Sequence, residues 1–284
     1  MTPLRFFLGL LVVVSLILIG CAGFERSETT DLTKHFIESG YEGTTVVYDV
    51  TQDRYTIVNP HRADKALLPA STFKIFNSML ALEAPVIRDE NEVIKWDGKV
   101  RENDAWNRDH DLTSAMKTSC YPYFQELARR IGKERMQQWL DRTNYGNHKV
   151  TPEIDSFWLE GDLRISARQQ VQFLTRLATW DLPFARRSMD ITRRIIINER
   201  TSDYTLYAKT GWAQHPTNVG WWVGWVEKKD GHIYVFATNI ESASPDAGFA
   251  EARIRITKDI LKDMGVLPKV EPKVDSAKPA EEGN

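Results

Sequence analysis

The chain has 284 residues, of which 42% are hydrophobic and 27% are charged. Its 37 basic side chains nearly balance its 39 acidic ones, and the formal net charge of -2 excludes a strongly basic nucleic-acid-binding surface. Nine Trp and 12 Phe exclude a wholly disordered chain, and two Cys are too few for a disulfide scaffold or a Cys-rich zinc site. The length accommodates one large domain or two closely packed lobes.

The N-terminus predicts an export signal. Arg5 precedes an apolar run over residues 6–19, which is short for a membrane span and has the length of a signal-peptide core. The run ends at Gly20-Cys21, which resembles a bacterial lipoprotein signal, where the Cys thiol accepts diacylglycerol after cleavage. An ordinary signal peptide or an anchor helix is the alternative. We expect an exported lipoprotein on the periplasmic face of a bacterial membrane, which contacts that membrane only through the lipid on Cys21.

One globular domain is expected between two polar segments. Residues 1–20 are the predicted signal peptide, and residues 21–30 are a predicted tether. Residues 268–284 are rich in Pro, Lys, Glu and Ala and predict a disordered tail. The domain is therefore expected over residues 31–267, and the sequence contains no internal repeat.

The pattern of elements predicts an α+β fold. A β-branched run and a second apolar run form a predicted hairpin, helical periodicity dominates the middle of the domain, and strands return near its end. The predicted hairpin strands cover 44–50 and 54–58, helices follow Pro69 and cover about 111–200, three strands cover 204–209, 219–226 and 233–238, and a last helix covers 247–264. We expect a central antiparallel β-sheet flanked by helices, with a helical lobe.

Ser71 and Lys74 are the first chemical signal. Pro69 and Ser71 are typical of a helix start, which places Lys74, three residues on, on the same face as Ser71. A Ser hydroxyl needs a base to become a nucleophile. If burial against Phe73 and Phe76 keeps Lys74 neutral, its amine can be that base or can react with carbon dioxide to give a carbamate. The alternative is a Ser helix cap beside a solvated Lys.

Two tripeptides carry further polar groups. Lys209-Thr210-Gly211 is predicted at the end of an edge strand, which can pair with an extended substrate. Its Lys offers charge to a carboxylate, its Thr a hydroxyl, and its Gly close approach, with the N–H of Trp212 as an oxyanion donor. An ordinary strand exit is the alternative. Tyr145-Gly146-Asn147 follows a helix expected to end near Asp141, where a helix C-cap loop is the alternative.

Together these residues resemble the serine-reactive penicillin-recognising enzymes, and most closely the class D β-lactamases, or oxacillinases. In that family S-x-x-K, S-x-V, Y-G-N and K-T-G occur in this chain order. Here the four motifs read Ser71-Thr72-Phe73-Lys74, Ser119-Cys120-Tyr121, Tyr145-Gly146-Asn147 and Lys209-Thr210-Gly211. Matching stretches also lie at 95–98, 157–161, 164–167 and 221–225, so the resemblance covers about residues 40–265 and implies the serine β-lactamase fold.

The resemblance implies a β-lactamase that hydrolyses the amide bond of β-lactam antibiotics through a serine acyl-enzyme. It implies Ser71 as the nucleophile and an N-carboxylated Lys74 as the general base for acylation and for the deacylating water. Trp158 would hydrogen-bond the carbamate, and Ser119 would pass a proton to the lactam nitrogen. The implied substrate-binding residues are Tyr145, Asn147, Lys209, Thr210, Gly211, Trp212 and Arg253, the last being a carboxylate-binding arginine with Arg255 nearby.

The only cofactor that the resemblance implies is carbon dioxide, bound covalently as the carbamate on Lys74. The six His are scattered without metal-ligand spacing, so no metal site is expected. The expected partner is a small β-lactam rather than a nucleic acid, and the sequence leaves monomer and dimer open.

Tyr121 departs from the family pattern, which has Val at this position. A small apolar residue there keeps the carbamate dry, whereas Tyr adds bulk and a hydroxyl that needs a partner. Narrowing of the pocket, altered substrate preference and weaker carboxylation of Lys74 are the three open consequences. If deacylation fails, the protein would trap the drug, as a penicillin-sensing receptor domain does. The sequence is also compatible with a D,D-peptidase-like protein and with a lipoprotein that only binds peptidoglycan.

Overall fold

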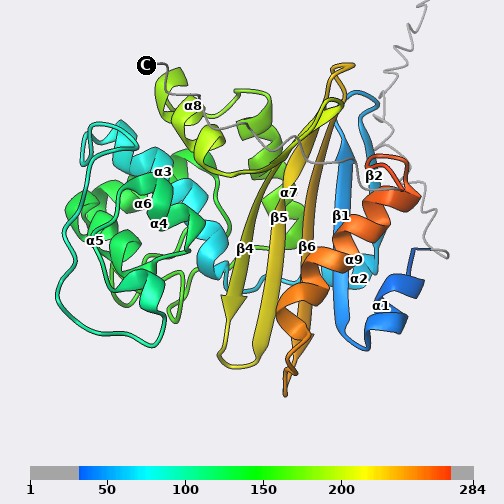
Figure 1. The fold of residues 1–284 in the computed structure, drawn as a ribbon, viewed down its shortest axis with the longest axis horizontal. Coiled ribbons are helices and arrows are strands. Elements are labelled where there is room, and N and C mark those ends of the chain that lie inside the picture. The colour runs from blue at the N-terminus through cyan, green and yellow to red at the C-terminus, as the bar shows by residue number, and fades with distance from the viewer. Residues whose placement is uncertain (1–31, 270–284) are drawn as a thin grey trace, which may run out of the picture.

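The computed structural model describes residues 32–269 (Figure 1). The predicted signal peptide, the lipidation site at Cys21, the tether and the tail beyond residue 269 lie outside the described residues. Between residues 32 and 269, no helix combines the length and the apolar character that a bilayer span requires.

A six-stranded sheet forms the centre of the fold, with the strand order β2-β1-β6-β5-β4-β3. Every neighbouring pair is antiparallel, which confirms the predicted antiparallel sheet. The strands are β1 Glu42–Asp49, β2 Arg54–Val58, β3 Ile197–Arg200, β4 Tyr204–Ala213, β5 Asn218–Lys228 and β6 Ile233–Ser242. Strand β3 was not predicted from the sequence, since its four residues carry no β-branched run and its pairing with β4 defines it.

Helices cover both faces of the sheet and build a lobe beside it. Figure 1 shows α9 and α1 in front of the sheet, α7 behind it, and α3 to α6 in the lobe next to β4, as the predicted α+β fold requires. The helices are α1 Lys34–Ser39, α2 Pro60–Ala63, α3 Lys74–Glu83, α4 Leu112–Lys117, α5 Tyr121–Ile131, α6 Lys133–Thr143, α7 Ala167–Ala178, α8 Arg186–Ile195 and α9 Phe249–Asp263. Two short 3-10 turns, η1 Ala70–Phe73 and η2 Asp104–Trp106, complete the set.

Alternating side chains of β5 connect two apolar cores, one on each face of the sheet. Trp221 and Trp225 enter the larger core with α3, α5 and α7, whereas Trp222 and Val226 enter the core under α9. A strand that is covered on both faces needs large apolar residues at successive positions. The tryptophans of β5 therefore pack the sheet, as their position in the sequence favours.

The Lys209-Thr210-Gly211 tripeptide lies inside β4, not at its end as predicted. β4 continues to Ala213 because β5 pairs with it along its whole length, from Tyr204↔Lys228 to Ala213↔Val219. On the other side, β3 reaches only Thr205 to Tyr207, so the second half of β4 is an open edge inside the molecule. The 3-10 turn η1 packs against this edge.

Gly211 permits that approach of η1. A Cβ on Gly211 would lie 2.9 Å from the carbonyl oxygen of Pro69, and Trp221 Nε1 donates to the carbonyl oxygen of Leu68 at 2.8 Å. The backbone of residues 68–69 is therefore held against β4 and β5, which places Ser71 next to the open edge of β4.

Candidate active site

Ser71 lies in the 3-10 turn η1, which runs directly into α3. The residue before it, Ala70, has a φ of +47°, which is uncommon for a non-glycine residue and costs on the order of 1 kcal/mol. The turn holds this conformation because Ala70 N donates to the carbonyl oxygen of Trp158 at 3.0 Å, and Thr72 Oγ1 donates to that of Pro69 at 2.7 Å. The hydroxyl of Ser71 is thus fixed at the start of a buried helix.

Lys74 reaches this hydroxyl, as the three-residue spacing predicts. Its Nζ lies 2.6 Å from the Oγ of Ser71 and 5.3 Å from the ring centre of Phe124. Lys74 has no exposed surface, and no carboxylate of residues 32–269 forms an ion pair with it. Burial, followed by the charge of Lys209, lowers the Lys74 pKa well below its ordinary value. This lowered pKa favours the neutral amine, which is the form that can act as a base.

Trp158 provides an unused donor close to this helix start. Its ring is fully buried and stacks on Phe73, with ring centres 5.3 Å apart. Its Nε1 is buried and has no hydrogen-bond partner among the described residues. A buried donor without a partner costs about 1–3 kcal/mol, so this position suits a ligand group that accepts a hydrogen bond.

Ser119 connects the turn between α4 and α5 to β4. Its φ of +53° is left-handed, and Lys209 Nζ donates to its Oγ at 3.1 Å. The same Nζ donates to the carbonyl oxygen of Thr210 at 3.1 Å. Burial, followed by the charge of Arg253, lowers the Lys209 pKa to about 7. The structure thus brings together Ser119, Lys209 and Thr210, with an amine that gains or loses a proton near neutral pH.

Arg253 extends from α9 to the same part of β4, and its Nη1 donates to the carbonyl oxygen of Gly211 at 2.6 Å. Its Nε is buried without a partner among residues 32–269, and burial lowers its pKa to about 10. Arg255 lies on the exposed side of α9. Trp212, 37% exposed, lies under Arg253 with 5.8 Å from its ring centre to the guanidinium carbon. Lys209 and Arg253 form no ion pair within residues 32–269, which makes this edge suitable for a carboxylate.

Tyr145 does not lie where its motif led us to expect, whereas Asn147 is exposed. Tyr145 is 1% exposed and packs between Phe73 and Phe173, so it cannot touch a substrate from there. The Asn147 amide donates to the carbonyl oxygen of Asp162, and its Oδ1 accepts from Arg164 N. Asn147 therefore holds residues 162–164, and its predicted substrate contact stays a prediction. The correction for Tyr145 arises because a motif does not state where its side chains point.

One residue near Lys74, Phe124, is absent from the predicted site, whereas Tyr121 is the residue that departs from the family pattern. Phe124, whose ring faces the Lys74 amine, belongs to the apolar face of α5, and helical periodicity was its only signal. Tyr121 is half-buried, packs edge-on against Trp106 with ring centres 4.9 Å apart, and lies 5.9 Å from the Arg101 guanidinium carbon. The sequence does not indicate that Tyr121, Trp106 and Arg101 are neighbours, and only the folded chain brings them together.

Comparisons with known proteins agree with this geometry. Residues 43–262 match the family described as the penicillin-binding protein transpeptidase domain. The chain is 40% identical over 259 residues to the β-lactamase OXA-48 of Klebsiella pneumoniae, covering 90% of this chain and 96% of that protein. It is 42% identical to the probable β-lactamase YbxI of Bacillus subtilis, with 80% and 82% covered. The crystal structure of the class D β-lactamase FUS-1 from Fusobacterium nucleatum superposes with a TM-score of 0.81 at 39% identity, covering 84% of this chain and 99% of that one.

The buried amine of Lys209 should make stability depend on pH. The unfolded chain binds this proton up to a pKa near the ordinary 10.5 and the folded chain only to about 7, so stability rises with pH between these values. Lys209→Met removes this gain. Urea unfolding at several pH values should show the wild type gaining up to about 1.4 kcal/mol per pH unit relative to the variant. Parallel curves would contradict the burial of a neutral amine, and Lys99→Met, at an exposed lysine, is the control.

Proposed function

Because the chain belongs to the class D serine β-lactamases, we propose that Ser71 is the nucleophile and Lys74 the base of its β-lactam hydrolysis. The observation that carries these roles is the 2.6 Å separation between Ser71 Oγ and a fully buried Lys74 Nζ. Lys74 takes the hydroxyl proton as Ser71 Oγ bonds to the lactam carbonyl carbon and the C–N bond of the ring breaks. The backbone N–H groups of Ser71 and Trp212 are the proposed donors to the oxyanion.

Ser119 is the proposed carrier of the proton to the lactam nitrogen. Its hydroxyl accepts a hydrogen bond from Lys209 Nζ at 3.1 Å, and burial lowers the pKa of Lys209 to about 7. Ser119 can therefore donate its own proton to the leaving nitrogen and take one from Lys209. Lys209, Thr210 and Arg253 then bind the substrate carboxylate along the open edge of β4, where no acidic side chain of residues 32–269 forms an ion pair with Lys209 or Arg253.

Carboxylation of Lys74 is a further part of the proposal. Only a neutral amine adds carbon dioxide, and burial keeps Lys74 neutral. The buried Trp158 Nε1, which has no partner among residues 32–269, fits a carbamate oxygen as its acceptor. Bound in this way, the carbamate supplies a carboxylate base for acylation and for the water that releases the product.

Export and lipid anchoring at Cys21 are also proposed, on the sequence alone. The apolar run over residues 6–19 and the Gly20-Cys21 junction support the lipoprotein signal. The intact mass of protein extracted from membranes should equal that of the chain from Cys21 plus its lipid. The mass of the unmodified chain from Met1 would contradict the anchor.

Nitrocefin hydrolysis tests the nucleophile and the base. Ser71→Ala should lower kcat/KM by about 10⁴-fold or more, because the acyl-enzyme no longer forms. Lys74→Ala should stop deacylation and so lower kcat to a similar extent. Ser202→Ala, at an exposed turn, is the matched control and should keep wild-type turnover. A single stoichiometric burst in the wild-type protein would indicate a penicillin sensor, and an unchanged kcat in Lys74→Ala would contradict the proposed base.

Bicarbonate dependence tests the role of Trp158. Trp158→Phe keeps an aromatic ring against Phe73 but removes the Nε1 donor, so the variant should need about tenfold more bicarbonate for half-maximal kcat. Trp139→Phe, whose ring stacks on Phe184 in the helical lobe, is the control. The proposed contact is wrong if Trp158→Phe loses activity that no concentration of bicarbonate restores, or if its bicarbonate requirement equals that of the wild type.

A further inference from the structure

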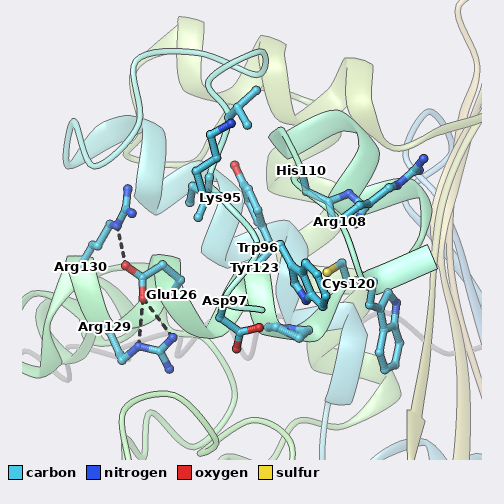
Figure 2. Close-up of a pocket in the computed structure, with 14 residues that line it drawn as sticks. Lys95, Trp96, Asp97, Arg108, His110, Cys120, Tyr123, Glu126, Arg129 and Arg130 are labelled. Atoms are coloured by element: carbon cyan, nitrogen blue, oxygen red, sulfur yellow. Dashed lines mark hydrogen bonds and ion pairs between the residues drawn. The ribbon is translucent and has the colours of Figure 1, made fainter. Parts of the chain in front are cut away.

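A separate cavity of about 410 Å³ lies in the helical lobe, between the segment 93–110 and α5 (Figure 2). Ser71, Lys74 and Lys209 do not line it. One of its lining residues is Cys120, which is 2% exposed and directly follows Ser119. Its volume falls in the range of pockets that bind small molecules.

The apolar part of the cavity consists largely of indole rings. Trp96 and Trp106 both line it, and both rings have already used their only hydrogen-bond donor. Trp96 Nε1 donates to the carbonyl oxygen of Lys99 at 3.1 Å, and Trp106 Nε1 donates to that of Thr118 at 3.0 Å. The rings therefore offer carbon surface to a ligand, which favours a flat apolar or aromatic body.

Tyr123 supplies a buried polar group without a partner. Its side chain lines the cavity and is 4% exposed, and no described residue hydrogen-bonds its hydroxyl. Figure 2 shows this hydroxyl between Lys95 and His110. The imidazole cannot serve it, because one ring nitrogen of His110 bonds Ser114 Oγ at 3.0 Å and the other bonds the carbonyl oxygen of Ala105 at 2.8 Å. A ligand acceptor would satisfy the hydroxyl.

One basic side chain of the cavity, Arg108, is left to bind an anion. Four basic and two acidic side chains line the cavity. Arg129 and Arg130 both bind the carboxylate of Glu126, as the dashed lines in Figure 2 show. Arg129 also pairs with Asp155 at 2.6 Å, and Lys95 pairs with Asp109 at 2.7 Å. Arg108 forms no ion pair with any of residues 32–269 and has an exposed side chain, so it is available to a ligand.

We propose that this cavity is a second ligand site, which binds a small aromatic carboxylate. The ring of the ligand packs on Trp96 and Trp106, and its carboxylate accepts a hydrogen bond from Tyr123 and offsets the positive charge to which Arg108 contributes. The ligand thereby lies against Cys120, one residue from Ser119. The site is independent of the acyl-enzyme chemistry, so its occupancy can be measured without a β-lactam.

Isothermal titration of the full chain with 2-naphthoate tests the proposal. The wild-type protein should bind one molecule, and 2-naphthalenemethanol, which lacks the charge, should bind more weakly. Tyr123→Phe removes only the hydroxyl and should weaken 2-naphthoate binding about fivefold. Arg108→Gln should weaken it about threefold, as expected for an exposed charge. Arg54→Gln, at an exposed arginine of β2 on the opposite side of the sheet, should leave the affinity unchanged.

Lys209→Met distinguishes this cavity from the carboxylate edge of the active site. The variant should bind 2-naphthoate as the wild type does, because Lys209 does not line the cavity. Loss of binding in Lys209→Met, with wild-type affinity in Tyr123→Phe and Arg108→Gln, would place the ligand at the active site and overturn the proposal. Absence of binding at millimolar 2-naphthoate would overturn it equally.

Discussion

The buried amine of Lys74 is the constraint on which the rest of the structure depends. An ammonium ion without a counter-charge costs several kcal/mol to bury, so burial lowers the pKa of the Lys74 amine well below its ordinary value. The fold contributes to this state by placing the Phe124 ring 5.3 Å from the nitrogen and by leaving every carboxylate of residues 32–269 outside ion-pair distance. This burial costs stability, and it is what the proposed role of Lys74 as the base for Ser71 requires.

Two turns of the site hold strained backbone. Ala70 and Ser119 both adopt positive φ without being glycine, and each carries a cost on the order of 1 kcal/mol or more. Both lie in the site, because Ala70 directly precedes Ser71, the proposed nucleophile, and Ser119 contacts Lys209. The two strained turns are held by distant elements, the Trp158 segment and β4, which explains how the fold maintains them.

The sequence predicts most of the fold and the local part of the site. The spacing of Ser71 and Lys74 is short, so helix geometry alone brings them together. By contrast, Lys209 and Ser119 are 90 residues apart, and only the packing of the helical lobe beside β4 makes them neighbours, so motif resemblance rather than local pattern placed both in the predicted site. The length of β4 came from its pairing with β5 and not from its own composition. The buried position of Tyr145 was missed because a motif specifies residue types without the directions of their side chains.

Carbon-13 NMR of the protein equilibrated with ¹³C-labelled bicarbonate tests the neutral state of Lys74 most directly, since only an uncharged amine captures carbon dioxide. We predict one protein-bound carbamate resonance in the wild-type protein, which persists in Ser71→Ala and is absent from Lys74→Ala. Identical spectra for the wild type and Lys74→Ala, together with an amine that titrates at the ordinary lysine pKa, would contradict a neutral Lys74.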